Sequence, residues 1–247
     1  MDKLAQKLLV FVLMLGVVAT AGASPITLDG NFAAQTNGSA VGSPWDGKTG
    51  GFATGSTNAQ SPFTNLYPKN AMGVTLSNYA HDYMGIGCVP VTTGLLGFNV
   101  DFTVSSFDSG TVNFTITKDW RADLEAAYIS VSAAGVYAKS SAGNGASLLT
   151  PELGKWYNVQ LTLNLDTNRY YGTITPDGGS SVAIDSRDFV ASGQGINSIV
   201  TDNANTNSPS YSVDNFALTI PEPAALSLLV LGGVLLARRR DGTASVR

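Results

Sequence analysis

The chain is poor in the residues on which many catalytic and metal sites depend. Its 247 residues include one cysteine, Cys88, and one histidine, His81. A single cysteine excludes an intramolecular disulfide, and one His with one Cys cannot complete a four-ligand zinc site. A Ser-His-Asp triad is available only if His81 serves it. Stability therefore has to come from a packed core, in which we expect Cys88 to be a small buried hydrophobe rather than a reactive thiol.

Charged residues are also scarce, at 13% of the chain. Positions 24–220 hold 8 basic and 15 acidic residues, a net charge of −7. Such a surface repels phosphate backbones, so we expect no nucleic-acid partner. No long segment has the 3.6-residue apolar period of an amphipathic helix, which argues against a helical domain.

The N-terminus has the pattern of an export signal. Lys3 and Lys7 precede an uninterrupted apolar run over 8–18, and Ala21 and Ala23 supply small residues at the −3 and −1 positions of a cleavage site. The run is too short to span a membrane, so residues 1–23 are predicted to be a secretory signal peptide. This prediction implies passage through the Sec translocon and cleavage by signal peptidase after Ala23.

The C-terminus has three parts in a fixed order. These are Pro221, Glu222 and Pro223, then the uncharged apolar segment 224–237, then Arg238, Arg239 and Arg240. As a helix the apolar segment would be about 21 Å long, short of a ~30 Å hydrocarbon core. The three arginines can snorkel to the headgroups and make up the difference, so a hydrophobic membrane helix is predicted.

This arrangement over 221–247 resembles a PEP-CTERM sorting signal, found in exopolysaccharide-producing bacteria. The resemblance implies a transient tail-anchored intermediate in the inner membrane and processing at Pro-Glu-Pro by an exosortase-type transpeptidase. The basic residues at both ends would stay in the cytoplasm, and 24–220 would be translocated. We expect the exported domain at the cell surface or in the extracellular matrix.

Between the two ends the apolar residues alternate with a period of two. In the segment 156–165, Tyr157, Val159, Leu161 and Leu163 alternate with polar residues, and 96–105 and 111–117 repeat the pattern. Strands buried on one face are typical of antiparallel sheets packed against each other. Further strands are expected near 26–28, 73–76, 83–86, 127–131, 135–138, 170–175, 182–184, 198–201 and 211–220.

Residues 24–220 are therefore predicted to form one all-β domain, an antiparallel two-sheet β-sandwich of the jelly-roll type. The segments 154–166 and 170–174 resemble the hairpins of concanavalin A-like/laminin G-like sandwiches, and 213–216 is similar to their last strand. The loop-rich stretch 31–68 is expected to form irregular excursions over the sandwich.

The sequence predicts that this domain is not an enzyme. Only two glutamates, Glu125 and Glu152, lie within 24–220, and the Glu-x-Asp-x-x-Glu arrangement of sandwich-fold glucanases is absent. The alternative is a glycan hydrolase that uses Asp123 and Glu125, which an extended chain would place on one face about 6.6 Å apart at their Cα atoms.

Two kinds of binding residue remain as candidates. Exposed aromatic rings can stack on sugars, and those in or beside predicted loops are Trp45, Tyr79, Tyr83 and Trp120. No cofactor is required, but calcium needs only oxygen ligands, and pairing of the first and last strands would bring together Asp29, Asn31 and Asp214. For both sets the alternative is packing or turn capping. We expect a carbohydrate-binding surface protein, with a purely structural one as the close alternative.

Overall fold

The computed structural model describes residues 24–25, 32, 45–48, 52–54, 61–63, 74–76, 83–117, 125–191, 195–204 and 209–220. Residues 25–220 form one compact unit, and 1–24 with 221–247 form another. The predicted signal peptide, 1–23, and the predicted sorting signal, 221–247, both lie outside the described residues. No helix in the described ranges is long and apolar enough to cross a membrane.

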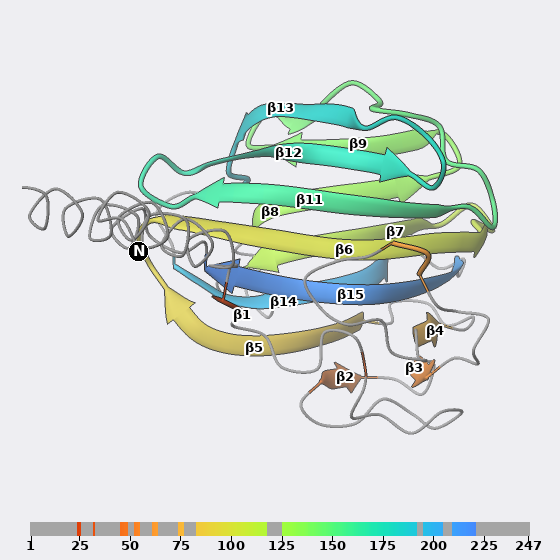
Figure 1. The fold of residues 1–247 in the computed structure, drawn as a ribbon, viewed down its shortest axis with the longest axis horizontal. Helices are drawn as coiled ribbons and strands as arrows, with labels where there is room; N and C mark the ends of the chain where they lie inside the picture. Colours follow the sequence, from red (N-terminus) through yellow and green to blue (C-terminus); the bar gives the residue numbers. More distant parts are fainter. Residues whose placement is uncertain are drawn as a thin grey trace, which may run out of the picture. The chain divides into compact units, whose positions relative to one another are not determined.

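The unit 25–220 consists of two antiparallel sheets, as the sequence predicts. Figure 1 shows them as two layers, one in front of the other. The first, sheet A, has the strand order β13-β12-β11-β6-β15-β4-β3, with β1 also paired to β15. Its strands are β1 (Ser24–Pro25), β3 (Phe52–Thr54), β4 (Val74–Leu76), β6 (Leu95–Ser106), β11 (Trp156–Asn164), β12 (Arg169–Pro176), β13 (Val182–Asp188) and β15 (Ser210–Ile220).

The second sheet, sheet B, has the order β10-β9-β8-β7-β14-β5-β2. Its strands are β2 (Asp46–Lys48), β5 (Tyr83–Val91), β7 (Thr111–Thr117), β8 (Glu125–Ser132), β9 (Gly135–Ser140), β10 (Gly143–Asn144) and β14 (Ile196–Ala204). Neighbours in space are often far apart in sequence, as in β6 beside β15 and β7 beside β14, which is the crossing connectivity of a jelly roll.

The alternation in the sequence determines which face each residue occupies. On β11, Tyr157, Val159, Leu161 and Leu163 are at most 2% exposed, and they face the other sheet. The turn predicted between 164 and 170 is present, and Asn168 there has a φ of 52°, a left-handed conformation that asparagine tolerates. The hairpin predicted from this segment is confirmed, with Asn164 opposite Arg169.

Trp45 lies in the core rather than at the surface. Its side chain is 5% exposed and stacks between Phe32, at 4.9 Å between ring centroids, and Phe216, at 5.5 Å. Burying rings of this size supplies much of the hydrophobic stabilisation of a domain that has no disulfide. This burial contradicts the expected glycan contact at Trp45 and agrees with the packing alternative.

The stretch 31–68 is more regular than the sequence indicates. It contributes β2 and β3, which lie at one edge of sheet B and of sheet A. Each has only three residues, and so short a strand carries no readable alternation. The remaining residues of this stretch, apart from the ranges given above, lie outside the described part.

Candidate functional site

The outer face of sheet A holds a buried cluster of polar side chains around Asp101. One oxygen of this carboxylate accepts from Asn158 Nδ2 at 2.5 Å, and the other accepts from Ser61 Oγ at 2.5 Å and Asn215 Nδ2 at 2.8 Å. Asp101 is completely buried, and these donors stabilise its charge. The cluster therefore fastens the segment 61–63 to the sheet.

Asp214 belongs to the same cluster and lies directly across from Asp101 on β15. Its two carboxylate oxygens accept backbone N–H groups, from Ser61 at 3.1 Å and from Asn215 at 2.8 Å. Both oxygens are thus engaged in holding the chain. The other proposed calcium ligands, Asp29 and Asn31, lie outside the described residues, so the predicted calcium site stays a prediction.

The outer face of sheet B is a second polar surface, and the strand register defines its members. Asn113 on β7 lies opposite Asp202 on β14, and Thr115 lies opposite Tyr128 on β8. Glu125, the first residue of β8, pairs with Thr117 after a register shift, and its negative charge acts on Tyr128. Together with Lys139 on β9, the group consists of Asn113, Thr115, Glu125, Tyr128, Lys139 and Asp202, and we call it the sheet B polar group.

Asn113 and Asp202 of this group are hydrogen-bonded to each other. Asn113 Nδ2 donates to Asp202 Oδ1 at 2.6 Å, and Asn113 is 1% exposed. Its amide oxygen and the hydroxyl of Thr115 have no hydrogen-bond partner within the described ranges. Buried polar atoms without partners are uncommon and costly in proteins, and such atoms often mark functional sites.

Tyr128 lies at the centre of the sheet B polar group. Burial raises the pKa of its phenol, and the negative charges of Asp202 and of Glu125 raise that pKa further. On its ring lies the Lys139 ammonium, with Nζ 3.7 Å from the ring centroid, which is a cation–π contact. Two carboxylates and one cation from different strands therefore act on a single aromatic side chain.

The structure brings some of the predicted glycan and catalytic residues to this face. The backbone register pairs Tyr83 with Asp202, so Tyr83 occupies a position beside the sheet B polar group. Glu125 of the predicted hydrolase pair lies on the face, whereas Asp123, Tyr79 and Trp120 lie outside the described residues. His81 lies outside them as well, and the side chain of Cys88 is not described.

Sequence reasoning missed Asn113, Asp202 and Lys139. The alternation in 111–117 places Asn113 and Thr115 on the polar face, but a polar face by itself indicates only solvent. Asp202 lies close to Asn113 because β14 pairs with β7, and the paired residues of these two strands are 81 to 93 positions apart in sequence. No local pattern predicts a pairing at that separation.

No protein-family model matches the sequence, and no curated protein matches it. Solved structures do match in fold. The catalytic domain of the glycoside hydrolase family 131 protein from Coprinopsis cinerea is 10% identical, with a TM-score of 0.53 over 79% of this chain and 94% of that one. A family 131 β-glucanase catalytic domain from Podospora anserina is 9% identical, with a TM-score of 0.52 over 78% and 95%.

A carbohydrate esterase from the Shiga toxin-encoding bacteriophage phi24B is 11% identical, with a TM-score of 0.51 over 81% of this chain and all of that one. A sialidase and the Lotus tetragonolobus seed lectin also match, with TM-scores of 0.49 and 0.45, and the chain covers only 19% of the sialidase. At these identities the likeness shows the fold alone.

These matches correct one expectation from the sequence. The prediction that the domain is not an enzyme is wrong as an inference from composition, because catalytic domains of glycoside hydrolases have this fold over most of the chain. The scarcity of glutamate and histidine is a poor guide to catalysis, because a fold can bring together carboxylates that are far apart in sequence and form no local motif. The described domain is an all-β jelly roll of two antiparallel sheets, and the two family 131 catalytic domains share this fold.

Proposed function

We propose that the domain is exported and acts on carbohydrate, recognising a glycan chain on the outer face of sheet B. The observation that carries this proposal is the sheet B polar group, in which two carboxylates, an ammonium and a phenol from three strands meet on one face. Sugar hydroxyls both donate and accept hydrogen bonds, which suits a surface of mixed donors and acceptors.

The half-buried side chains at the rim would make the first contacts. Glu125, Lys139 and Asp202 are each partly exposed, whereas Asn113 and Tyr128 beneath them are buried. Buried neighbours restrict the rim side chains to few rotamers, and that preorganisation lowers the entropic cost of binding.

A glycan panel tests the proposal with one matched control. We expect Asp202→Asn to weaken the binding of whichever glycan the wild type binds. The substitution removes the negative charge, whereas the amide oxygen of the new side chain can still accept the hydrogen bond from Asn113. Glu152→Gln should bind like the wild type, since Glu152 is an exposed carboxylate paired with Lys155 at 2.9 Å, outside the sheet B polar group. Equal binding by all three proteins, or no glycan bound by any, would contradict the proposal.

Glycoside cleavage by Glu125 and Asp202 is a second candidate. Both carboxylates act electrostatically on the Tyr128 phenol, which they approach from two different strands. The register separates their Cα atoms by about 16 Å, from four residues along β7 and two strand spacings. Both side chains would have to lean toward each other to reach the roughly 6.5–9.5 Å between carboxyl groups of inverting enzymes, and the roughly 5 Å of retaining enzymes is out of their reach. Turnover by the wild type that both Glu125→Gln and Asp202→Asn abolish would support it.

Sorting to the cell surface is the remaining part of the proposal, and the sequence alone supports it. The order Pro221 to Pro223, apolar segment and Arg238 to Arg240 motivates it, together with the signal peptide at 1–23. We propose that an exosortase-type transpeptidase processes the tail and that the domain then faces extracellular polysaccharide.

A further inference from the structure

The outer face of sheet A has an uncharged strip on β11 and β12, separate from the sheet B polar group. The register places Gln160 opposite Thr173 and Thr162 opposite Tyr171. Trp156 begins β11 on the same face, six residues before Thr162. We call this surface the β11–β12 strip, made of Trp156, Gln160, Thr162, Tyr171, Thr173 and Thr175.

The side chains of the strip are accessible. Gln160 is exposed, Tyr171 is 45% exposed, and Trp156 and the three threonines are half-buried. Tyr171 is one of four large hydrophobic residues exposed in the described ranges, and of these four it alone is aromatic. Opposite Tyr171 the pairing of β12 with β13 shifts between Tyr170 and Gly172, which is a β-bulge on β13. Bulges commonly redirect a neighbouring side chain.

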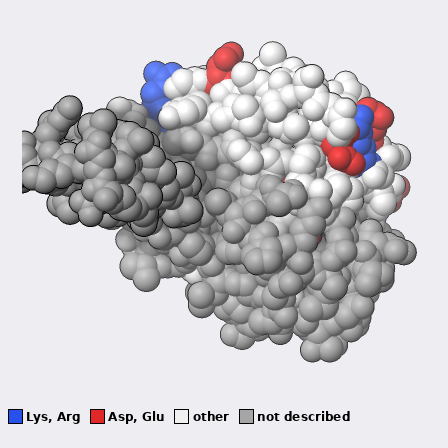
Figure 2. All heavy atoms as spheres, viewed as in Figure 1, with Lys and Arg blue, Asp and Glu red and all other residues white. Residues whose placement is uncertain are grey.

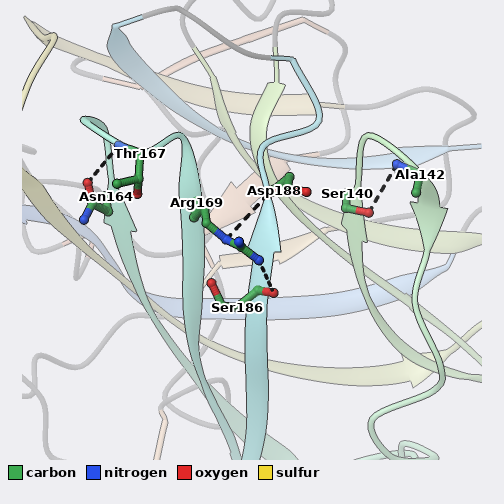
Figure 3. A network of polar contacts seen from close by, with 7 residues as sticks. All are labelled: Ser140, Ala142, Asn164, Thr167, Arg169, Ser186 and Asp188. Carbon is green, nitrogen blue, oxygen red and sulfur yellow. Dashed lines mark hydrogen bonds and ion pairs between the residues drawn. The ribbon is translucent and has the colours of Figure 1, made fainter.

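No member of the strip is charged. Asn158, between Trp156 and Gln160 on β11, is buried and bonded to the buried Asp101 carboxylate, so it is not part of the accessible surface. Figure 2 shows this face of the molecule, with charged side chains near the edges of the part drawn in white, and β13 beside the strip carries the exposed Asp185 and Asp188. At one end Arg169 is held by Ser186, with Nη2 3.2 Å from the carbonyl oxygen, and by Asp188, with Nε 3.5 Å from Oδ1. Figure 3 shows that these contacts run from β12 to β13 beside the turn capped by Asn164.

The dimensions and chemistry of the strip suit one class of ligand. Six residues of β11 extend about 20 Å, so an aromatic ring lies near each end of a row of amide and hydroxyl groups. Flat rings stack on sugar faces, and the groups between them can bond sugar hydroxyls. The net charge of −7 over 24–220 disfavours an anionic polymer, whereas a neutral chain has no charge to be repelled.

From these observations we infer that the β11–β12 strip is a second glycan-binding surface, which holds neutral polysaccharide on the sheet opposite the sheet B polar group. It would bind one stretch of polymer while the sheet B polar group acts on another. Two linked contacts raise the overall affinity for a long chain without changing the affinity of either site.

Affinity electrophoresis of the full chain in a non-glycosidic detergent tests this inference, with dextran, xyloglucan or β-glucan in the gel and alginate as the anionic comparison. Tyr171→Ala should weaken retardation by at least one neutral polymer roughly threefold to tenfold. Gln160→Ala should weaken it less. The control Leu153→Ala removes a side chain that is 59% exposed and off the strip, and it should be retarded like the wild type.

Parallel measurement of Asp202→Asn separates this inference from the proposed function. Loss of retardation in Tyr171→Ala with retention in Asp202→Asn supports the strip even if the sheet B proposal fails. Unchanged retardation of Tyr171→Ala, or no retardation of the wild type by any neutral polymer, overturns the inference. A wild-type dimer in light scattering that Tyr171→Ala dissociates would overturn it too, because the strip would then bind a second copy of the chain.

Discussion

The side-chain amide of Asn113 donates a 2.6 Å hydrogen bond to the Asp202 carboxylate, across strands that are 89 positions apart in sequence. This bond fixes one carboxylate of the sheet B polar group on β14. Asn113→Ala would remove the amide donor, so the Asp202 carboxylate would lose this hydrogen bond. We expect glycan binding to weaken and unfolding free energy to fall by about 1–3 kcal/mol.

Asn113→Asp is the sharper companion variant. It keeps the volume of the side chain and replaces the donor with a second carboxylate facing Asp202, which would repel it. Urea unfolding should show a larger loss of stability than for Asn113→Ala. An Asn113→Asp protein as stable as the wild type would show that this bond does not position Asp202.

Trp45 provides a direct test of the assignment of the core. Trp45→Ala should lower the free energy of unfolding by about 3–5 kcal/mol, because the ring stacks on Phe32 and Phe216 in the interior. Leu153→Ala, at an exposed position, should change it by no more than about 0.5 kcal/mol. If Trp45→Ala instead kept its melting temperature and lost glycan binding, the surface role would be right.

The buried carboxylate of Asp101 predicts a similar contrast between two aspartates. Asp101→Ala leaves the donors of Ser61, Asn158 and Asn215 without their acceptor, so the loss of stability should be about 3–5 kcal/mol. Asp185→Ala removes an exposed carboxylate on β13 and should be nearly neutral. Chemical denaturation of the two variants is sufficient for the comparison. Similar unfolding free energies would mean that the cluster does not hold the segment 61–63.

Alkaline pH should destabilise the domain through its buried phenols. Burial raises the pKa of Tyr128 and of Tyr170, and Asp202 and Glu125 raise that of Tyr128 further. Because the folded-state pKa lies above the unfolded value of about 10, the stabilising contribution is complete below pH 10 and is lost as pH rises through the folded-state pKa. Unfolding free energy measured at increasing pH should fall above about pH 10, and Tyr128→Phe should reduce that fall. An equal fall in the variant would contradict the assignment.

The predicted tail processing has its own measurement. Intact-mass analysis of protein from the surface fraction should show chains that start at Ser24 and end at or near Pro221 to Pro223. Full-length chains ending at Arg247 in that fraction would remove the sorting proposal. Either result leaves the fold and the sheet B polar group unaffected.

How far the sequence predicts this molecule depends on the range of the interactions. The strand 111–117 is predicted with its observed bounds and 156–165 to within one residue, because alternation is local, and the two-sheet sandwich follows from one-sided burial. The order of strands in each sheet was not predicted, because β7 and β14 meet through pairing of distant segments. For the same reason the sequence suggests Asp123 as the partner of Glu125. In the fold, Glu125 and Asp202 together raise the pKa of Tyr128.

The central claim is that a glycan is recognised on the outer face of sheet B. The most direct measurement is a crystal structure of the protein with the best ligand from the glycan panel. We expect sugar density over Glu125, Lys139 and Asp202, with hydroxyl groups within hydrogen-bond distance of at least one carboxylate. Sugar bound elsewhere on the domain, with none on that face, would contradict it.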